Sequence, residues 1–337
     1  MAKVSVLGSG GWGTAVSVML SENGHEVTLW SYLKSENEDL IKYRENKPFL
    51  PGVKIPENIK LTCELSECSG ADITVIATPS HGVRAVAKRF SEFAEDNSVI
   101  LNISKGIEEK TYMTLSKVIK EELPKCKIAV MSGPSHAEEV SRKIPTTNVV
   151  AADSTEVAEF IQDVFMNPNF RVYTNTDIIG VELGGSLKNV YALCCGIIDG
   201  MGLGDNTKAA LMTRGLAEMT RLGVKMGADS KTFSGLSGMG DLIVTCTSMH
   251  SRNRRAGILI GKGKSVEEAQ KEVNMVVEGV RTCRAAKELS ERLNVEMPII
   301  EEAYRVLFSG ARLSEVVLRL MGRSKKNETE DEFLNEE

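Results

Sequence analysis

The sequence has no excess of positive charge and no long hydrophobic run. Its 337 residues carry 41 Lys and Arg against 46 Asp and Glu, which gives a formal net charge of −5. Such a chain has no surplus of cations to displace counterions from nucleic-acid phosphates. No apolar run is long enough to cross a bilayer. We therefore expect no nucleic acid and no membrane span, and small molecules as the partners.

The sequence also lacks metal-binding and disulfide patterns. Its seven cysteines form no C-x-x-C pair and no Cys/His cluster at metal-ligand spacing, so no metal site is expected. No signal peptide precedes the first strand-like run. Together with free thiols, this favours a reducing compartment and a cytoplasmic protein.

A glycine-rich turn stands near the N-terminus in an informative context. The β-rich run 3–7 leads directly into Gly8-Ser9-Gly10-Gly11-Trp12-Gly13, and a helical pattern and a second strand, 25–30, follow. This is G-x-G-x-x-G between a strand and a helix. Gly8 allows the tight turn, Gly10 lets the backbone approach a pyrophosphate, and Gly13 lets the helix pack on the strand. Free N–H groups at the helix start would bind the phosphates, so the motif predicts a dinucleotide site.

The end of the second strand bears on the choice between NAD and NADP, because an acidic residue there binds the ribose hydroxyls of NAD. Trp30, Ser31, Tyr32 and Lys34 occupy this stretch, and none is acidic. The 2′-phosphate of NADP should therefore be tolerated and could be preferred. The alternative is that NAD binds through other contacts.

Three further strand-like runs each end in a polar loop: residues 72–77, 98–103 and 127–131. Ligands of open parallel sheets bind beyond the carboxyl ends of the strands. Lys105 is the favoured functional residue among these loops, and His81 is better explained as a helix-start residue. Gly133 and Ser135 could offer backbone and hydroxyl hydrogen bonds to a ligand. Residues 46–52, with two prolines, form an excursion that could be a mobile rim.

The pattern changes near residue 176 and divides the chain. Before it, strands alternate with helices, and 147–151 and 170–173 flank a helix at 155–166. After it, helical patterns dominate to about residue 322. The sequence predicts an α/β fold, with a Rossmann-type dinucleotide-binding domain in 1–176 and a mostly helical substrate and catalytic domain in 177–323. A charged, flexible tail is expected in 324–337.

Residues 177–193 predict a buried helix that carries one lysine. Ile179, Leu183 and Leu187 form an apolar stripe, and a second column follows every fourth residue: Gly180, Gly184, Lys188 and Ala192. Glycines inside a helix cost about 1 kcal/mol each, so a close neighbour should compensate. One interpretation is tight helix packing with Lys188 reaching water. The other is a cleft floor with Lys188 as an acid/base group.

Two later segments carry charged residues at helix starts. Asp241 follows a glycine-punctuated turn, where it could cap a helix or pair with Lys188. Ser251-Arg252-Asn253-Arg254-Arg255 precedes a helical run, where guanidinium groups and free N–H groups could bind a phosphate; a solvated basic face is the alternative. Glu278 lies in a loop before another helix and could contact a ribose hydroxyl.

Taken in order, six motifs resemble the bacterial NAD(P)-dependent glycerol-3-phosphate dehydrogenases: residues 8–13, 104–106, 132–135, 184–189, 240–242 and 251–255. The resemblance covers the chain from Val4 to about Gly322. It implies an NAD(P)-dependent oxidoreductase with a Rossmann-type domain followed by a helical domain. The implied reaction is the reversible NAD(P)H-dependent reduction of dihydroxyacetone phosphate to sn-glycerol 3-phosphate, which supplies glycerophospholipid synthesis.

The resemblance also implies roles for individual residues. Lys188 would be the catalytic acid/base, with Lys105, Asp241 and Thr245 around the reacting centre. The implied substrate contacts are Lys105, Gly133, Ser135, Lys188, Asp241, Ser251, Arg252 and Asn253. The implied cofactor contacts are Gly8, Gly10, Gly11, Trp12, Gly13, Tyr32, Lys105, Ala137, Arg252, Val276 and Glu278. Tyr32 departs from the His or Arg of many relatives, which leaves the preference between NADP and NAD open.

The chemistry suits these roles. Hydride transfer to the C2 ketone leaves an alkoxide that needs a proton, and Lys188 can supply it. Burial and the like charge of Lys105 are expected to lower the pKa of Lys188, whereas Asp241 would hold the amine and oppose that shift. Arg252 could bind the substrate phosphate and thereby orient the ketone.

Two alternatives remain at this stage. A related hydroxyacid or phosphogluconate dehydrogenase could share the architecture, although the basic cluster suits a small phosphate better than a simple hydroxyacid. A dinucleotide-sensing regulator would have the same cofactor domain and no chemistry. The helical second domain makes a homodimer plausible.

Overall fold

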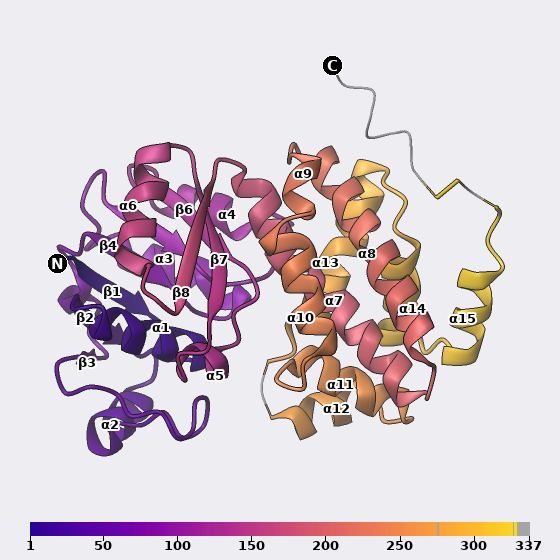
Figure 1. Ribbon diagram of the computed structural model, residues 1–337, viewed down its shortest axis with the longest axis horizontal. Helices are drawn as coiled ribbons and strands as arrows, with labels where there is room; N and C mark the ends of the chain where they lie inside the picture. The colour runs from indigo at the N-terminus through magenta and orange to yellow at the C-terminus, as the bar shows by residue number, and fades with distance from the viewer. Residues whose placement is uncertain (275, 326, 329–337) are drawn as a thin grey trace. The chain divides into compact units, whose positions relative to one another are not determined.

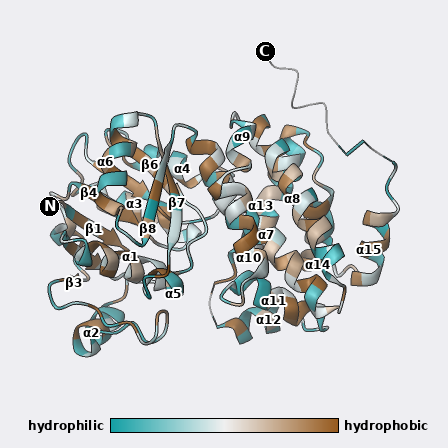
Figure 2. Ribbon diagram, in the orientation of Figure 1, coloured by the Kyte–Doolittle hydropathy of each residue, from teal (hydrophilic) through white to brown (hydrophobic). Residues whose placement is uncertain are grey.

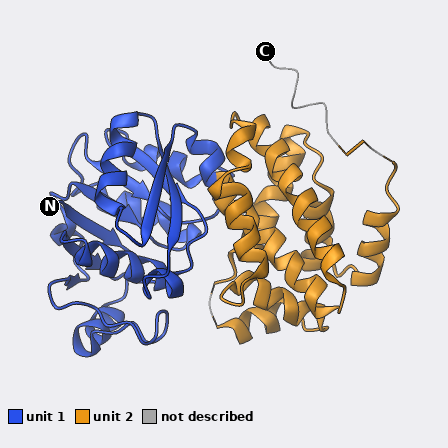
Figure 3. Cartoon of the chain, viewed as in Figure 1, with its two compact units in different colours: residues 1–182 blue, residues 183–337 orange. Residues whose placement is uncertain are grey.

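The computed structural model describes residues 1–337 except 275, 326 and 329–337. The chain forms two compact units, Met1–Glu182 and Leu183–Glu337 (Figure 3). The division falls inside one long helix, six residues after the boundary expected from the sequence. Most of the expected tail, 324–337, lies outside the described residues.

Unit 1 is built on an eight-stranded sheet (Figure 1). The strands are β1 Lys3–Leu7, β2 Glu26–Trp30, β3 Lys60–Thr62, β4 Ile73–Ile76, β5 Val99–Asn102, β6 Lys127–Ser132, β7 Thr146–Ala152 and β8 Phe170–Asn175. Their order is β3-β2-β1-β4-β5-β6-β7-β8, and neighbours are parallel except β6 and β7. This order contains the Rossmann arrangement, with its switch point between β1 and β4. The predicted α/β fold is confirmed. The three-residue β3 was not anticipated.

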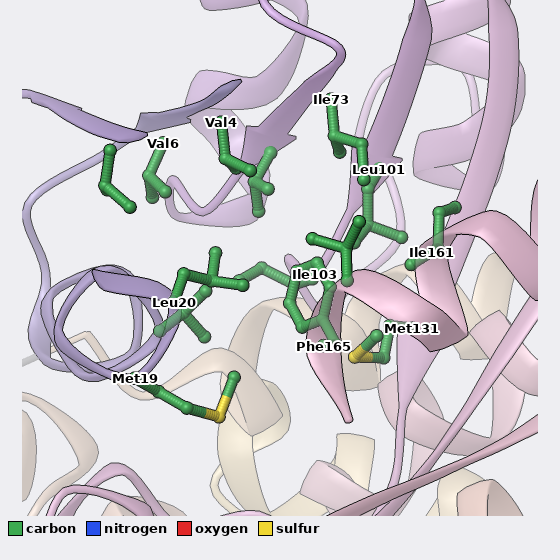
Figure 4. Close-up of a cluster of buried hydrophobic side chains, with 14 of the residues drawn as sticks. Val4, Val6, Met19, Leu20, Ile73, Leu101, Ile103, Met131, Ile161 and Phe165 are labelled. Carbon is green, nitrogen blue, oxygen red and sulfur yellow. The ribbon is translucent and has the colours of Figure 1, made fainter. Parts of the chain in front are cut away.

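Helices cover both faces of this sheet. The helices of unit 1 are α1 Gly11–Glu22, α2 Lys34–Tyr43, α3 Val83–Phe90, α4 Leu115–Glu122, α5 Ala137–Val140 and α6 Thr155–Phe165, with short 3₁₀ turns at Leu65–Cys68 and Ser80–Gly82. Along β1, Val4 and Val6 face the core under α1 and α6 (Figure 4), whereas Leu7 faces the core under α3 and α4. Opposite faces of one strand thus fill two cores.

In unit 2, the regular secondary structure of the described residues is entirely helical. Its helices are α7 Ile178–Gly200, α8 Asp205–Lys225, α9 Ser230–Phe233, α10 Asp241–Thr247, α11 Arg252–Gly261, α12 Val266–Val273, α13 Glu278–Leu293, α14 Pro298–Ser309 and α15 Leu313–Met321, with a π-helical turn at Leu236–Gly240. Figure 2 shows the hydropathy along each of them. The predicted buried helix is α7, which is buried from residue 180 to residue 198. Among the described residues, no helix is long and apolar enough to cross a membrane.

Candidate functional site

The glycine-rich turn follows β1, and its glycines have different surroundings. Gly8 has φ +128°, and an added Cβ there would lie 2.7 Å from the Ala77 carbonyl oxygen. At Gly13 the same atom would lie 1.9 Å from the Gly8 carbonyl oxygen. At Gly10, by contrast, no protein atom lies within 4 Å of the added Cβ. Packing therefore requires Gly8 and Gly13, whereas the space beside Gly10, next to the first turn of α1, is open.

The excursion 46–52 is joined to this turn by hydrogen bonds at its first residue. The buried Asn46 side chain donates hydrogen bonds to the Ser9 carbonyl oxygen (2.7 Å) and to Thr14 Oγ1 (2.8 Å). An added Cβ at Gly11 would lie 2.6 Å from the Phe49 carbonyl oxygen. No local pattern in the sequence indicates this contact, because a single buried asparagine provides the hydrogen bonds.

A cation from another element, Arg89, lies beside the end of β2. Tyr32 is 61% exposed, and its ring meets the buried Trp30 edge-on at 5.9 Å. The Arg89 guanidinium of α3 lies 5.5 Å from the Tyr32 ring centre and 5.7 Å from the Trp30 ring centre. Arg89 thus brings positive charge to the stretch after β2 that lacks an acid. It could not be predicted from the local sequence, because it lies on helix α3.

The loops after β5 and β6 bring three predicted residues together. Lys105 Nζ donates to the Gly133 carbonyl oxygen at 3.3 Å, and Ser135 Oγ donates to the same oxygen at 3.0 Å. Gly133 is needed there, because an added Cβ would lie 2.3 Å from Asn148 Oδ1. His81 lies in the 3₁₀ turn just before α3, which confirms its interpretation as a helix-start residue.

Glu182 supports the Lys105 loop and was missed from the sequence. Its buried carboxylate accepts hydrogen bonds from Asn102 Nδ2 (3.2 Å) and the Ser116 backbone N–H (2.9 Å). Asn102 in turn accepts one from the Ser104 N–H at 3.1 Å, next to Lys105. Burial raises the pKa of Glu182, and the hydrogen bonds from Ser116 only partly offset this effect. An acid within an apolar helical stripe was the available signal.

In unit 2, Lys188 forms a buried cluster with two residues of α10. Its side chain is 7% exposed and forms an ion pair with Asp241 Oδ1. Lys188 Nζ also donates a hydrogen bond to Thr245 Oγ1 at 2.9 Å, and Thr245 donates to the Asp241 carbonyl oxygen at 2.6 Å. The Lys188 side chain is therefore largely buried and its amine is bound by α10. Asp241 acts as its partner and not as a helix cap, since Gly240 occupies the cap position.

The glycine column beside Lys188 lets another backbone come close. An added Cβ at Gly184 would lie 2.6 Å from the Ser237 carbonyl oxygen and 3.2 Å from the Gly238 nitrogen. The π-helical turn that contains these atoms leads directly into α10. Close packing at Gly184, one turn before Lys188, thus helps to place Asp241 and Thr245 beside the lysine.

The basic cluster opens α11, but its members point to different partners. Ser251 caps the helix by accepting a hydrogen bond from the Arg254 N–H at 3.2 Å. The Asn253 amide is held on both sides, donating to Asn189 Oδ1 (2.9 Å) and accepting from the Gly279 N–H (2.8 Å). Arg252 is exposed at the first helical position. Within the described residues, Arg255 Nε is buried without a hydrogen-bond partner.

Arg254 does not join an anion site, which corrects the expectation that three arginines converge on a phosphate. Its guanidinium binds Asp199 Oδ2 through Nε (2.8 Å) and Nη2 (2.7 Å). Asp199 is the penultimate residue of α7, and no motif marked it. The remaining predicted cofactor contacts lie near helix starts: Ala137 begins α5, Glu278 begins α13 and is not in the loop before it, and Val276 lies two residues earlier.

Two further observations concern other parts of the described chain. No group of three or more His, Cys, Asp or Glu residues among them could hold a metal ion. A largely apolar cavity of about 490 Å³, with walls from α8, α14 and α15, contains none of the predicted site residues.

Comparisons with known proteins assign the chain to a family. The N-terminal family model of NAD-dependent glycerol-3-phosphate dehydrogenase matches residues 3–158, and the C-terminal model matches residues 177–318. The chain belongs to the NAD-dependent glycerol-3-phosphate dehydrogenase family. The Fusobacterium nucleatum glycerol-3-phosphate dehydrogenase [NAD(P)+] is 54% identical over 97% of this chain and 99% of that protein. The enzyme of the same name from Thermoanaerobacter is 55% identical over 97% and 98%.

Solved structures agree with this family. The glycerol-3-phosphate dehydrogenase of Coxiella burnetii superposes with a TM-score of 0.93 at 36% identity, over 96% of this chain and 99% of that one. A ketopantoate reductase from Ralstonia eutropha, at 13% identity and a TM-score of 0.60, shares the fold alone. The resemblance, the fold class, the activity of a glycerol-3-phosphate dehydrogenase and the use of an NAD(P) cofactor are confirmed.

Proposed function

We propose that Lys188 is the general acid/base in the reversible reduction of dihydroxyacetone phosphate to sn-glycerol 3-phosphate. The observation that carries this proposal is the buried cluster of Lys188, Asp241 and Thr245. The nicotinamide cofactor, when bound, supplies the hydride for C2 of the substrate. The Lys188 ammonium then gives a proton to the C2 oxygen, and the neutral amine takes a proton back in the reverse direction. Asp241 and Thr245 hold the amine in position.

The substrate phosphate is assigned to the start of α11. The exposed Arg252 guanidinium and the N–H groups of the first helical turn supply charge and donors. Ser251 and Asn253 contribute by fixing this turn, because their side chains are committed to Arg254, Asn189 and Gly279. Lys105, Gly133 and Ser135, which lie together in unit 1, complete the proposed substrate contacts.

The nicotinamide dinucleotide is assigned to the glycine-rich turn and its surroundings. The proposed contacts are Gly8, Gly10, Gly11, Trp12, Gly13, Tyr32, Lys105, Ala137, Arg252, Val276 and Glu278. The open space beside Gly10 supports this assignment. The absence of an acid at the end of β2, together with Arg89 beside Tyr32, favours NADP over NAD.

Further proposals concern the cellular role, the oligomeric state and the roles of the domains. We propose that the protein supplies glycerol 3-phosphate for glycerophospholipid synthesis in the cytoplasm and works as a homodimer. We further propose that 1–176 is the cofactor-binding domain and that 177–323 is the substrate and catalytic domain. A flexible tail, 324–337, follows them. Analytical ultracentrifugation tests the dimer, and a monomeric sedimentation coefficient at micromolar concentration would refute it.

A substrate panel tests the proposed reaction. NADPH oxidation is followed at 340 nm with dihydroxyacetone phosphate, unphosphorylated dihydroxyacetone and a simple 2-keto acid. Rapid oxidation with the phosphorylated ketone alone is expected. Equal rates with unphosphorylated dihydroxyacetone would contradict a role for the proposed phosphate site. Reduction of the keto acid alone would favour a hydroxyacid dehydrogenase.

A further inference from the structure

Asp199 lies at the centre of an ion cluster outside the predicted catalytic residues. Besides the two hydrogen bonds from Arg254, its Oδ1 pairs with Lys208 Nζ of α8 at 2.5 Å. All three side chains are at most 17% exposed. Burial raises the pKa of Asp199, but the hydrogen bonds from Lys208 and Arg254 outweigh this effect and lower the pKa overall. The carboxylate is therefore ionised at neutral pH.

Arg254 connects this cluster to the two helices that carry the proposed site. It lies two residues after Arg252, in the first turn of α11. Its Nη1 donates a hydrogen bond to the Thr247 carbonyl oxygen at 2.7 Å, at the end of the helix that carries Asp241 and Thr245. Asp199 thus holds a guanidinium that bridges α7, α10 and α11.

Glycines bring α7 and α11 into backbone contact along the same seam. Added Cβ atoms at Gly196 and Gly200 would lie 2.1 Å and 2.3 Å from the carbonyl oxygens of Arg254 and Ile258. At Gly257 and Gly261 they would lie 2.0 Å and 2.3 Å from carbonyl oxygens of α7. Both helices carry glycines four residues apart, so their backbones meet without intervening side chains. A charged anchor across such a seam, from the end of α7 to the first turn of α11, fixes where α11 begins relative to α7.

We infer that Asp199 is a positioning residue for substrate binding: through Arg254, it holds the first turn of α11 where Arg252 and the helix N–H groups can bind the substrate phosphate. The inference rests on the proposed phosphate site at this turn. It also accounts for Arg254, which a role in phosphate binding does not, because the Arg254 guanidinium already binds Asp199 and the Thr247 carbonyl oxygen. The inference therefore predicts that loss of the Asp199 charge changes the KM for the substrate more than it changes kcat.

The test is Asp199→Asn, which keeps the side-chain shape and removes the charge. We expect the KM for dihydroxyacetone phosphate to rise about tenfold, with kcat changed less than threefold and the KM for NADPH unchanged. The inhibition constant of inorganic phosphate should rise in parallel. Asp199→Glu should restore most of the affinity. Glu272→Gln, which breaks the exposed Lys264–Glu272 ion pair beyond the end of α11, is the control with the same charge change and should leave KM unchanged.

A double-mutant cycle separates positioning from general stabilisation. In an Arg252→Ala background, Asp199→Asn should raise KM less than twofold further, although it lowers Tm as much as in the wild type. An unchanged KM for dihydroxyacetone phosphate in Asp199→Asn, with a lowered Tm, would overturn the inference. A full tenfold rise in this KM when Asp199→Asn is added to Arg252→Ala would also overturn it. If Asp199→Asn fails to fold, Lys208→Gln should give the same pattern with a smaller rise. A wild type that does not reduce dihydroxyacetone phosphate would contradict the proposed function, whereas phosphate affinity measured by calorimetry still tests Asp199.

Discussion

Single residues of the glycine-rich turn separate cofactor binding from folding. Gly10→Ala places a methyl group in open space, whereas Gly13→Ala places one 1.9 Å from the Gly8 carbonyl oxygen. We expect Gly10→Ala to keep the wild-type Tm and to weaken NADPH binding at least tenfold. Gly13→Ala should lower the free energy of unfolding by about 2 kcal/mol or more. Intrinsic tryptophan fluorescence measures the binding, and unchanged NADPH affinity in Gly10→Ala would argue against the proposed place of the pyrophosphate.

Arg89 is expected to favour the cofactor with a 2′-phosphate. Arg89→Ala should weaken binding of 2′,5′-ADP about tenfold and leave binding of ADP nearly unchanged, because only the former carries the additional phosphate. Lys88→Ala changes the net charge equally one residue away and is the matched control. Equal losses in both variants would indicate general electrostatics and not a contact of Arg89.

At this scale the sequence indicated types of residue better than their partners. Pairing of Asp241 with Lys188 is one of two interpretations that the sequence allows, because a lone acid among apolar residues either caps a helix or needs a partner; the structure selects the pair. Arg254 was wrongly grouped with Arg252, since its partner Asp199 lies far away in the sequence and carries no motif. A hydrogen bond between distant side chains leaves no local pattern, and the same holds for Asn46.

At the scale of elements, the packing of α7 on the turn before α10 can be tested at Gly184. Gly184→Ala would place a Cβ 2.6 Å from the Ser237 carbonyl oxygen. We expect a loss of about 1–3 kcal/mol in the free energy of unfolding and a fall in kcat, since α10 carries Asp241 and Thr245. Urea denaturation and steady-state kinetics measure the two effects. Gly204→Ala, where nothing lies within 4 Å of the added Cβ, is the control, and equal effects at both positions would contradict this account.

Elements with strong periodicity were predicted well, and weakly marked elements were not. The helices expected at 155–166 and 177–193 have apolar stripes, and the structure confirms them as α6 and α7. The strand β3 has only three residues and pairs with β2 alone, so its sequence carries almost no alternation. The glycines of α11 resemble ordinary helix weakeners until their contact with α7 is known.

At the scale of the whole molecule, stability should depend on the buried Glu218. It accepts hydrogen bonds from the Ile299 N–H (2.6 Å), the Ile300 N–H (3.3 Å) and Tyr191 (3.1 Å), and burial raises its pKa to about 7. Between about pH 4.5 and pH 7, the folded protein keeps a proton that the unfolded chain releases, so this contribution to stability is complete below pH 4.5 and is lost as the pH rises through 7.

Glu218→Gln removes this titration. The free energy of unfolding of the wild type minus that of the variant should be larger at pH 5 than at pH 8 by roughly 1–3 kcal/mol. Urea denaturation at several pH values measures it. Glu315→Gln, at an exposed position, should follow the wild-type pH profile. A pH-independent difference for Glu218→Gln would show that the folded protein does not hold this proton.

The central claim is that Lys188 transfers the proton, and the most direct measurement is single-turnover NADPH oxidation by Lys188→Met with dihydroxyacetone phosphate. The variant keeps the buried stem and removes the amine, and adding Asp241→Asn avoids an unpaired buried carboxylate. We predict a hydride-transfer rate 10²–10⁴ times slower than the wild type in both variants, with NADPH binding unchanged. A wild-type rate in either folded variant would contradict the account.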